Sequence, residues 1–203
     1  MSGPSFTAVN QPASFAFTAE NLAQAKKIIA RYPAGRQASA VMPLLDLAQR
    51  QHDGWLPTAA MNTVADMIGV PHIRAYEVAT FYTMYNLAPV GKHVVQVCTT
   101  TPCWLRGSGA IMDACQTHLG IRTGETTADG QFTLREAECL GACVNAPLAR
   151  IGDDYYEDLT PETATRLLDD LKAGRAVTSG SQSGRQTSAP AGGPTTLLTR
   201  TGG

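Results

Sequence analysis

Four of the five cysteines in the chain form two close pairs, Cys98 with Cys103 and Cys139 with Cys143. Thiolates are soft metal ligands. Four of them around one point suit Zn²⁺ or an iron–sulfur cluster, and they suit hard cations poorly. The two pairs therefore predict a four-thiolate centre that serves a structural or a redox purpose.

The spacing within each pair bears on which centre this is. The first pair is separated by four residues and the second by three. Zinc sites most often use a C-x2-C spacing, although wider spacings up to C-x4-C occur. A [2Fe–2S] cluster holds two irons apart and takes two external thiolates at each, which suits two wider loops. The residues alone leave both centres open, and thiol–disulfide exchange is a weaker alternative because neither pair has the C-x2-C spacing.

The residues around the pairs are suited to negatively charged sulfur. Gly141 can adopt a positive φ angle, which lets the loop between Cys139 and Cys143 fold tightly and turn backbone N–H groups toward sulfur. The hydroxyl groups of residues 99–101 are further candidate donors. Cys115 lies on an apolar helical face, where we expect it to pack as a small core residue and not to bind the metal.

The first part of the chain, residues 15–90, is expected to form a helical domain. Apolar residues recur there at the i, i+3, i+4, i+7 spacing of a buried helical face. Thr18 is a suitable N-cap for the first helix, and Pro57 stands near the start of the third. The first predicted helix begins at Thr18. The second carries residues 41–48 and stops before Gly54. The third lies between Pro57 and Gly69, and the fourth runs over residues 71–86.

Residues 91–174 are expected to form a small α/β sheet domain. The expected elements are a strand at 93–98, a helix after Gly107, a strand at 132–139, a hairpin over 148–159 and a final helix from Thr160 to Gly174. Each cysteine pair lies at or after the end of a predicted strand. Strand ends on one edge of a sheet bring distant loops together, so the two pairs could share one point.

The two ends of the chain are expected to lack regular structure. Residues 1–14 are interpreted as a flexible N-terminus, and residues 175–203 as a disordered tail. The tail is rich in Gly, Ser, Thr and Pro and has no acidic residue. Such a composition buries too little apolar surface to offset the entropy that ordering costs. Anchoring of the tail on a partner through Leu197 and Leu198 is a weaker alternative.

Charge and hydropathy exclude several classes of protein. The net charge is −1 and there is no Lys/Arg-rich run, which argues against nucleic-acid binding. The apolar runs are far shorter than the roughly 20 residues that cross a bilayer, so any membrane association would come through a partner. The N-terminus has no targeting pattern, which favours a cytosolic protein. We expect the acidic cluster of Asp153, Asp154, Glu157 and Asp158 to be a solvated face. A docking surface is the weaker alternative.

Several segments of the sequence resemble one known family. VCTTTPCWLRG, residues 97–107, and ECLGACVNAP, residues 138–147, are similar to the signature of the 24 kDa subunit family, also called the E subunit family, of NADH:quinone oxidoreductase, respiratory complex I. Residues 53–71 and 76–86 also resemble the N-terminal region of that family. The likeness covers about residues 15–174. It implies an α+β protein, in which an N-terminal helical bundle precedes a thioredoxin-like α/β [2Fe–2S] ferredoxin domain.

The resemblance also implies a cofactor and its ligands. The cluster ligands of the family fall on Cys98, Cys103, Cys139 and Cys143, so these residues are expected to bind one [2Fe–2S] cluster. No catalytic residues of the chain's own are expected, and it would act in an enzyme only as a subunit. FMN and NADH are expected on a larger partner protein, beside the other components of the peripheral arm.

The function that the resemblance implies is electron transfer in the peripheral arm of complex I. The expected location is the cytoplasmic side of a bacterial plasma membrane, as a peripheral subunit without a membrane span. The close alternative is the equivalent diaphorase subunit of an NAD-linked hydrogenase or formate dehydrogenase. From another class, a structural zinc-binding interaction module would use the same four thiolates without redox activity.

Overall fold

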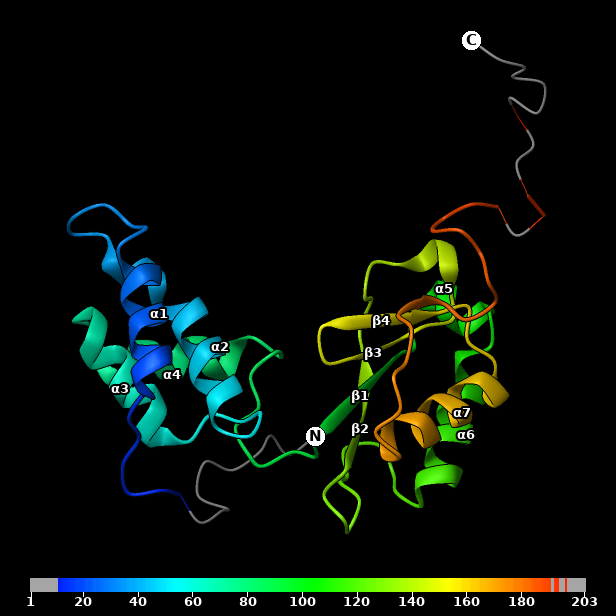
Figure 1. The fold of residues 1–203 in the computed structure, drawn as a ribbon, viewed down its shortest axis with the longest axis horizontal. Coiled ribbons are helices and arrows are strands. Elements are labelled where there is room, and N and C mark those ends of the chain that lie inside the picture. Colours follow the sequence, from blue (N-terminus) through cyan, green and yellow to red (C-terminus); the bar gives the residue numbers. More distant parts are fainter. Residues whose placement is uncertain (1–10, 191, 194–195, 197–203) are drawn as a thin grey trace. The chain divides into compact units, whose positions relative to one another are not determined.

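The computed structural model describes residues 11–190, 192–193 and 196, and the predicted flexible segment 1–14 therefore lies mostly outside the described residues. The chain divides between Val90 and Gly91 into two compact units, which are described separately below (Figure 1).

The first unit is built from helices. They are α1 (Ala19–Ile29), the 3-10 helix η1 (Gln37–Ala40), α2 (Val41–Gln51), α3 (Thr58–Ile68) and α4 (His72–Phe81). Thr18 is the N-cap of α1, since its hydroxyl oxygen accepts a hydrogen bond from the Asn21 N–H at 3.2 Å. The four predicted α-helices are confirmed. Their apolar faces meet in one core, whose fully buried members include Leu44, Leu45, Val64, Ala65 and Ala75.

The fourth helix is shorter than the sequence pattern predicts, because α4 ends at Phe81 and not near Asn86. The following residues bond to α2 and to the turn after it instead of continuing the helix. The Tyr85 hydroxyl donates to the Met42 carbonyl at 2.9 Å. Asn86 donates its backbone N–H to Gln49 at 2.7 Å. These tertiary bonds compete with another helical turn and hold the segment in an irregular path.

The second unit is a five-stranded mixed sheet with the order β2-β1-β3-β4-β5. Its strands are β1 (His93–Cys98), β2 (Phe132–Ala137), β3 (Ala149–Ile151), β4 (Asp154–Glu157) and β5 (Gly180–Ser181). Its helices are α5 (Thr101–Leu105), α6 (Ser108–Leu119), the 3-10 helix η2 (Cys143–Asn145) and α7 (Pro161–Lys172). Side chains of α6 and α7 share a core with β1, β2, β3 and β4 (Figure 1). The predicted hairpin and both long helices are confirmed.

Strand β1 pairs in parallel with the edge strand β2, so the carboxyl ends of these two strands lie at the same edge of the sheet. Cys98, the last residue of β1, is paired with Ala137, the last residue of β2. The prediction for β1 is correct at both ends, whereas β2 ends two residues before the predicted Cys139. Cys139 therefore belongs to the loop that leaves the sheet edge.

Gly91, the first residue of the second unit, lies against the start of β2. Its N–H donates to the Thr133 hydroxyl at 2.6 Å. A β-carbon at this position would come within 2.6 Å of the Phe132 carbonyl carbon. The close approach leaves room only for glycine.

The segment after Gly174 departs from the expectation of disorder in its described part. Residues 180–181 form β5, which pairs in parallel with β4. Arg185 forms an ion pair with Asp158 at 2.7 Å. The Asp158 side chain is consequently shielded from water and is not part of a solvated acidic face, which corrects one member of the expected acidic cluster. Leu197 and Leu198 lie outside the described residues.

The helices are short. Of those in the described residues the longest, α6 and α7, have twelve residues each. At about 1.5 Å per residue they span roughly 18 Å, less than the roughly 30 Å core of a bilayer. In the part of the chain that the structure describes, no helix has the length and apolar character of a membrane span.

Candidate metal centre

The first cysteine pair is held at the end of β1 by a short helix that sequence reasoning missed. Cys98 is the last residue of β1, and the N–H of the next residue, Thr99, donates to the Ala137 carbonyl. Helix α5 begins two residues after Thr99 and contains Cys103. Pro102 stands in the first turn of α5, where its missing N–H costs nothing. The helical turn brings Cys103 back into hydrogen-bonding contact with Cys98. Both side chains are fully buried.

The second pair lies in the loop after β2. Cys139 is exposed, and Cys143 is half-buried at the start of η2. Their sulfur atoms are 3.5 Å apart. Gly141 has a φ angle of 84°, and its N–H donates to the Cys139 sulfur. The predicted role of Gly141 as a tight turn that directs an N–H toward sulfur is thus confirmed.

The two pairs face each other across the sheet edge. The Leu140 N–H, from the second loop, donates to the sulfur of Cys98 in the first. Thr100 bonds to Cys98 with an oxygen–sulfur distance of 3.4 Å, and it also bonds to Cys139. Cys143 interacts electrostatically with both thiols of the first pair. The structure therefore brings all four predicted cysteines to the same edge of the sheet, as two facing pairs.

Of the three neighbouring hydroxyl groups considered from the sequence, only that of Thr100 has a bond to sulfur among the described contacts. Thr99 donates to the Glu136 carboxylate, which lies on the neighbouring strand. Thr101 is exposed at the start of α5. One threonine thus touches both cysteine pairs, and the other two serve the surrounding structure.

Within each pair the two thiols differ in acidity. Burial alone would raise the pKa of Cys98, but hydrogen bonds from Thr100, Leu140 and Cys103 lower it. Burial raises the pKa of Cys103 to about 12, with a further contribution from Cys98.

The second pair divides in the same way. The Gly141 N–H and then Cys143 lower the pKa of Cys139. The hydrogen bond to Cys139, followed by burial, raises the pKa of Cys143. One thiol in each pair therefore deprotonates first and the other retains its proton. Bound metal would supply the positive charge that favours the thiolate form of all four cysteines.

The donor set fits a two-iron cluster. A [2Fe–2S] cluster takes two external thiolates at each iron, and the four cysteines are arranged as two sulfur pairs on facing loops. Among the residues described, no group of three or more His, Cys, Asp or Glu side chains is placed to hold one metal ion.

Tyr155 and Glu157 lie outside the cysteine motifs but contact the second loop, a role that was not anticipated. The Tyr155 hydroxyl donates to the Leu140 carbonyl at 2.7 Å. Asn145 donates its side-chain N–H to the Glu157 carboxylate at 2.6 Å. The sequence does carry a signal for Tyr155. Side chains alternate between the two faces of the strand 154–157, so Tyr155 must point away from the main core into which its neighbour Tyr156 points.

Cys115 lies away from this cluster, as expected. It is on α6 and packs with Ile111, Phe132 and Leu168 in the core of the second unit. Burial raises its pKa to about 11. A thiol held neutral in an apolar core behaves as a small hydrophobic residue and is not available as a ligand.

Large apolar side chains beside the cysteines are exposed. Trp104 and Leu105, which directly follow Cys103, are 66% and 70% exposed, and Val144, next to Cys143, is 59% exposed. Exposed aromatic and aliphatic residues gathered near a functional site are typical of a surface that another protein covers.

Comparisons with known proteins agree with this chemistry. The family model described as thioredoxin-like [2Fe-2S] ferredoxin matches residues 25–172. The E subunit of NADH-quinone oxidoreductase from Rickettsia bellii (strain RML369-C) is 59% identical over 159 residues, which are 78% of this chain and 95% of that protein. The mitochondrial NADH dehydrogenase [ubiquinone] flavoprotein 2 of Dictyostelium discoideum is 53% identical over 189 residues, which are 93% of this chain and 76% of that protein.

A solved structure shares the fold. The crystal structure of an NAD+-reducing [NiFe]-hydrogenase in the air-oxidized state matches with a TM-score of 0.56 and 20% sequence identity. The match covers 64% of this chain and only 23% of the hydrogenase chain. At this identity the likeness establishes a common arrangement of helices and strands.

Proposed function

This chain belongs to the thioredoxin-like [2Fe-2S] ferredoxin family, and on that premise we propose that it is the electron-transferring E subunit of an NADH-quinone oxidoreductase. The observation that carries the proposal is the meeting of the two cysteine pairs at one sheet edge, where the second loop donates an N–H to the sulfur of Cys98. The high identity to the E subunit of such an enzyme, over 95% of that protein, supports this choice of complex.

Cys98, Cys103, Cys139 and Cys143 would hold the [2Fe–2S] cluster. When bound, such a cluster accepts and returns single electrons. The N–H groups of Leu140 and Gly141 point at two of the sulfurs and would stabilise their negative charge.

Burial of the two thiols of the first pair excludes water on one side of the site, while the second pair stays accessible. The chain's own contribution is therefore to fix the ligands and to set the polarity around them.

A flavin- and NADH-binding protein is the partner that we propose for the exposed apolar surface of Trp104, Leu105 and Val144. An electron carrier must come close to its redox partner. Trp104 and Val144 each directly follow a cysteine ligand, and Leu105 follows Trp104. The surface offers the apolar anchors that a stable interface uses. We place the complex at the cytoplasmic side of a bacterial membrane, with this chain as a peripheral subunit.

The test is metal analysis of the anaerobically purified chain, combined with visible absorption and electron paramagnetic resonance after reduction. About two irons and two acid-labile sulfides per chain, with a spin-half signal in the reduced protein, are expected for a [2Fe–2S] cluster. Stoichiometric zinc without colour, persisting after anaerobic reconstitution with iron and sulfide, would instead support the structural zinc module.

The diaphorase alternative is separated from the main proposal by its partners. Copurification with a flavin subunit and with quinone-reducing subunits supports NADH-quinone oxidoreductase. Copurification with a hydrogenase or formate dehydrogenase component would support the alternative and leave the cluster assignment intact. The match to a hydrogenase concerns the fold alone.

A further inference from the structure

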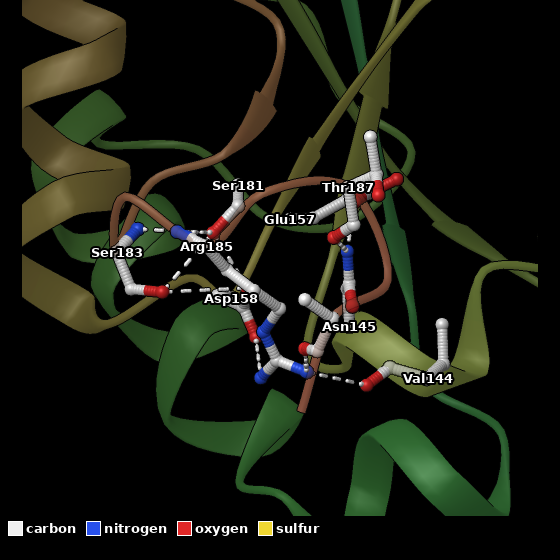
Figure 2. A network of polar contacts seen from close by, with 9 residues as sticks. Val144, Asn145, Glu157, Asp158, Ser181, Ser183, Arg185 and Thr187 are labelled. Carbon is white, nitrogen blue, oxygen red and sulfur yellow. Dashed lines mark hydrogen bonds and ion pairs between the residues drawn. The ribbon is translucent and has the colours of Figure 1, made fainter. Parts of the chain in front are cut away.

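The segment after α7 runs back across the second cysteine loop. We call residues 178–190 the strap. It begins beside β4, where Gly180 and Ser181 pair with Tyr156 and Glu157. The Gln182 N–H continues this pairing, since it donates to the Glu157 carbonyl at 2.8 Å. Figure 2 shows the strap passing over η2, the short helix that begins at Cys143.

Arg185 joins the strap to two other segments. Its guanidinium donates to the Asp158 carboxylate at 2.7 Å and to the Val144 carbonyl at 3.3 Å (Figure 2). The Arg185 and Asp158 side chains are only 13% and 6% exposed. A pair so well shielded from water is costly to break, because the remaining partner would be a buried charge.

The Asp158 carboxylate also accepts hydrogen bonds from two serines of the strap. The Ser181 hydroxyl donates to it at 2.6 Å, and the Ser183 hydroxyl at 3.4 Å. The backbone N–H of Asp158 donates to the Asn145 carbonyl at 2.8 Å. Asp158 thus links the strap directly to the cysteine loop through both its side chain and its backbone.

Asn145 is held from two sides. Its side-chain amide donates to the Glu157 carboxylate at 2.6 Å and to the Thr187 carbonyl of the strap at 2.8 Å (Figure 2). Asn145 is buried, although it belongs to a short loop at the surface. Both residues that follow Cys143, Val144 and Asn145, are therefore bonded to the strap.

We propose that the strap positions the second cysteine loop and that Arg185 is its main positioning residue. The first pair is buried in a core and needs no such support. Cys139 and Cys143 lie in an irregular, accessible loop, and a loop with few buried apolar contacts opens easily. By holding Val144 and Asn145, the strap keeps Cys143 facing Cys139 and slows the opening through which bound iron would be lost. The consequence for iron rests on the proposed function; the effect on the loop does not.

The first experiment is amide hydrogen exchange on the full chain without metal, comparing wild type with Arg185→Gln. We expect exchange over residues 140–148 to become roughly tenfold faster or more, since about 1.4 kcal/mol of lost loop stability corresponds to tenfold. Exchange over β1 should stay as in wild type.

Two outcomes of the exchange experiment would contradict the proposal. Equal acceleration over both regions would make Arg185 a contributor to overall stability alone, and no acceleration would remove its role; either outcome overturns the proposal.

Arg175→Gln is the matched control. It removes the same charge from the same terminal segment and breaks an ion pair of 2.6 Å with Asp170. That pair is more exposed, at 59% and 29% of the two side chains, and lies at the end of α7, so exchange over residues 140–148 should not change. A control variant that accelerated exchange there as much as Arg185→Gln would overturn the proposal.

Arg185→Lys keeps the charge but loses the planar fork that spans two acceptors. We expect its acceleration over residues 140–148 to lie between wild type and Arg185→Gln. This variant also decides the matter if Arg185→Gln does not fold, because unchanged exchange in Arg185→Lys would contradict the bridging role.

The second experiment measures transfer of iron from the loaded chain to a chelator. Release should be several-fold faster in Arg185→Gln and unchanged in Arg175→Gln. Equal release rates in wild type and Arg185→Gln would refute the positioning role while leaving the cluster assignment in place. If no iron is bound at all, the proposed function fails, and the exchange experiment still decides whether the strap holds the loop.

Discussion

Cys98 lies opposite Ala137 in the parallel pairing of β1 and β2, at the last position of both strands. This register decides where the second cysteine loop starts. Because Cys139 is only two residues beyond Ala137, it leaves the sheet at the same edge as Cys98. A shift of the register by one residue would turn Cys98 to the other face of the sheet and separate the two pairs.

The ligand assignment predicts different outcomes for two cysteine substitutions. Cys139→Ser should abolish or strongly reduce the iron and sulfide content, because one of four thiolates is lost. Cys115→Ala should keep the content and the visible spectrum of wild type, because Cys115 is in the separate core of the second unit. Metal analysis and absorption spectra check both variants, and loss of iron only in Cys115→Ala would reverse the assignment.

The docking surface predicts weakened binding of the flavin-bearing partner on substitution of Leu105. Leu105→Ser removes a side chain that is 70% exposed. If Leu105 is an interface anchor, the loss should be about 2 kcal/mol, or roughly 30-fold in Kd. Titration of the partner protein measures the effect. The iron content should not change, and Leu22→Ser, on α1, is the control for an exposed leucine far from the cysteine motifs in sequence; equal weakening in both variants would contradict a dedicated surface.

The buried thiol of Cys115 predicts a pH dependence. Its pKa is raised by burial from 9.0 to about 11. Between these values the unfolded thiol loses its proton and the folded thiol keeps it, so the unfolded state is favoured as pH rises. The stabilisation that the thiol provides below pH 9 should thus fall by about 2 kcal/mol on approaching pH 11.

Denaturant unfolding of wild type and Cys115→Ala at pH 7.5 and at pH 10.5 isolates this contribution. Wild type should lose more stability than Cys115→Ala over that interval. Parallel losses in the two proteins would show that Cys115 titrates normally in the folded state.

The N-cap of α7 predicts a local stability effect. The Thr160 hydroxyl oxygen accepts from the Thr163 N–H at 3.2 Å, and the Thr163 hydroxyl accepts from the Thr160 N–H at 2.8 Å. Thr160→Ala should lower the free energy of unfolding by about 1 kcal/mol. Thr165→Ala is the control, since Thr165 bonds only to carbonyls within the helix. Calorimetry distinguishes the two, and equal effects would argue against capping.

The sequence was most informative where a pattern is local and repeated. The β-branched run of β1 and the periodic apolar faces of α2 and α3 predicted those elements correctly, because each residue contributes to the same face. The five residues of α5 are too few to show a helical period, and Thr99 to Thr101 were interpreted only as possible donors. Only the structure shows the short helix, in which Cys103 comes back into hydrogen-bonding contact with Cys98.

The strap was missed for a different reason. Its composition alone indicates disorder, but Arg185 finds Asp158 at a separation of 27 residues in the chain. A single long-range ion pair leaves no periodic trace in the sequence. Glu157 and Asp158 were considered together with their acidic neighbours as a surface feature, whereas their partners, Asn145 and Arg185, lie 12 and 27 residues away in the sequence.

The contact between Gly91 and the start of β2 limits where the chain can be truncated or fused to another protein. A fusion that attaches the sheet unit to another protein must retain a glycine at position 91, since any side chain there would collide with the Phe132 backbone. The N–H of Gly91 must also be retained to bond to Thr133. A sheet unit prepared alone should therefore begin upstream of residue 91, so that its first strand keeps this attachment to the second.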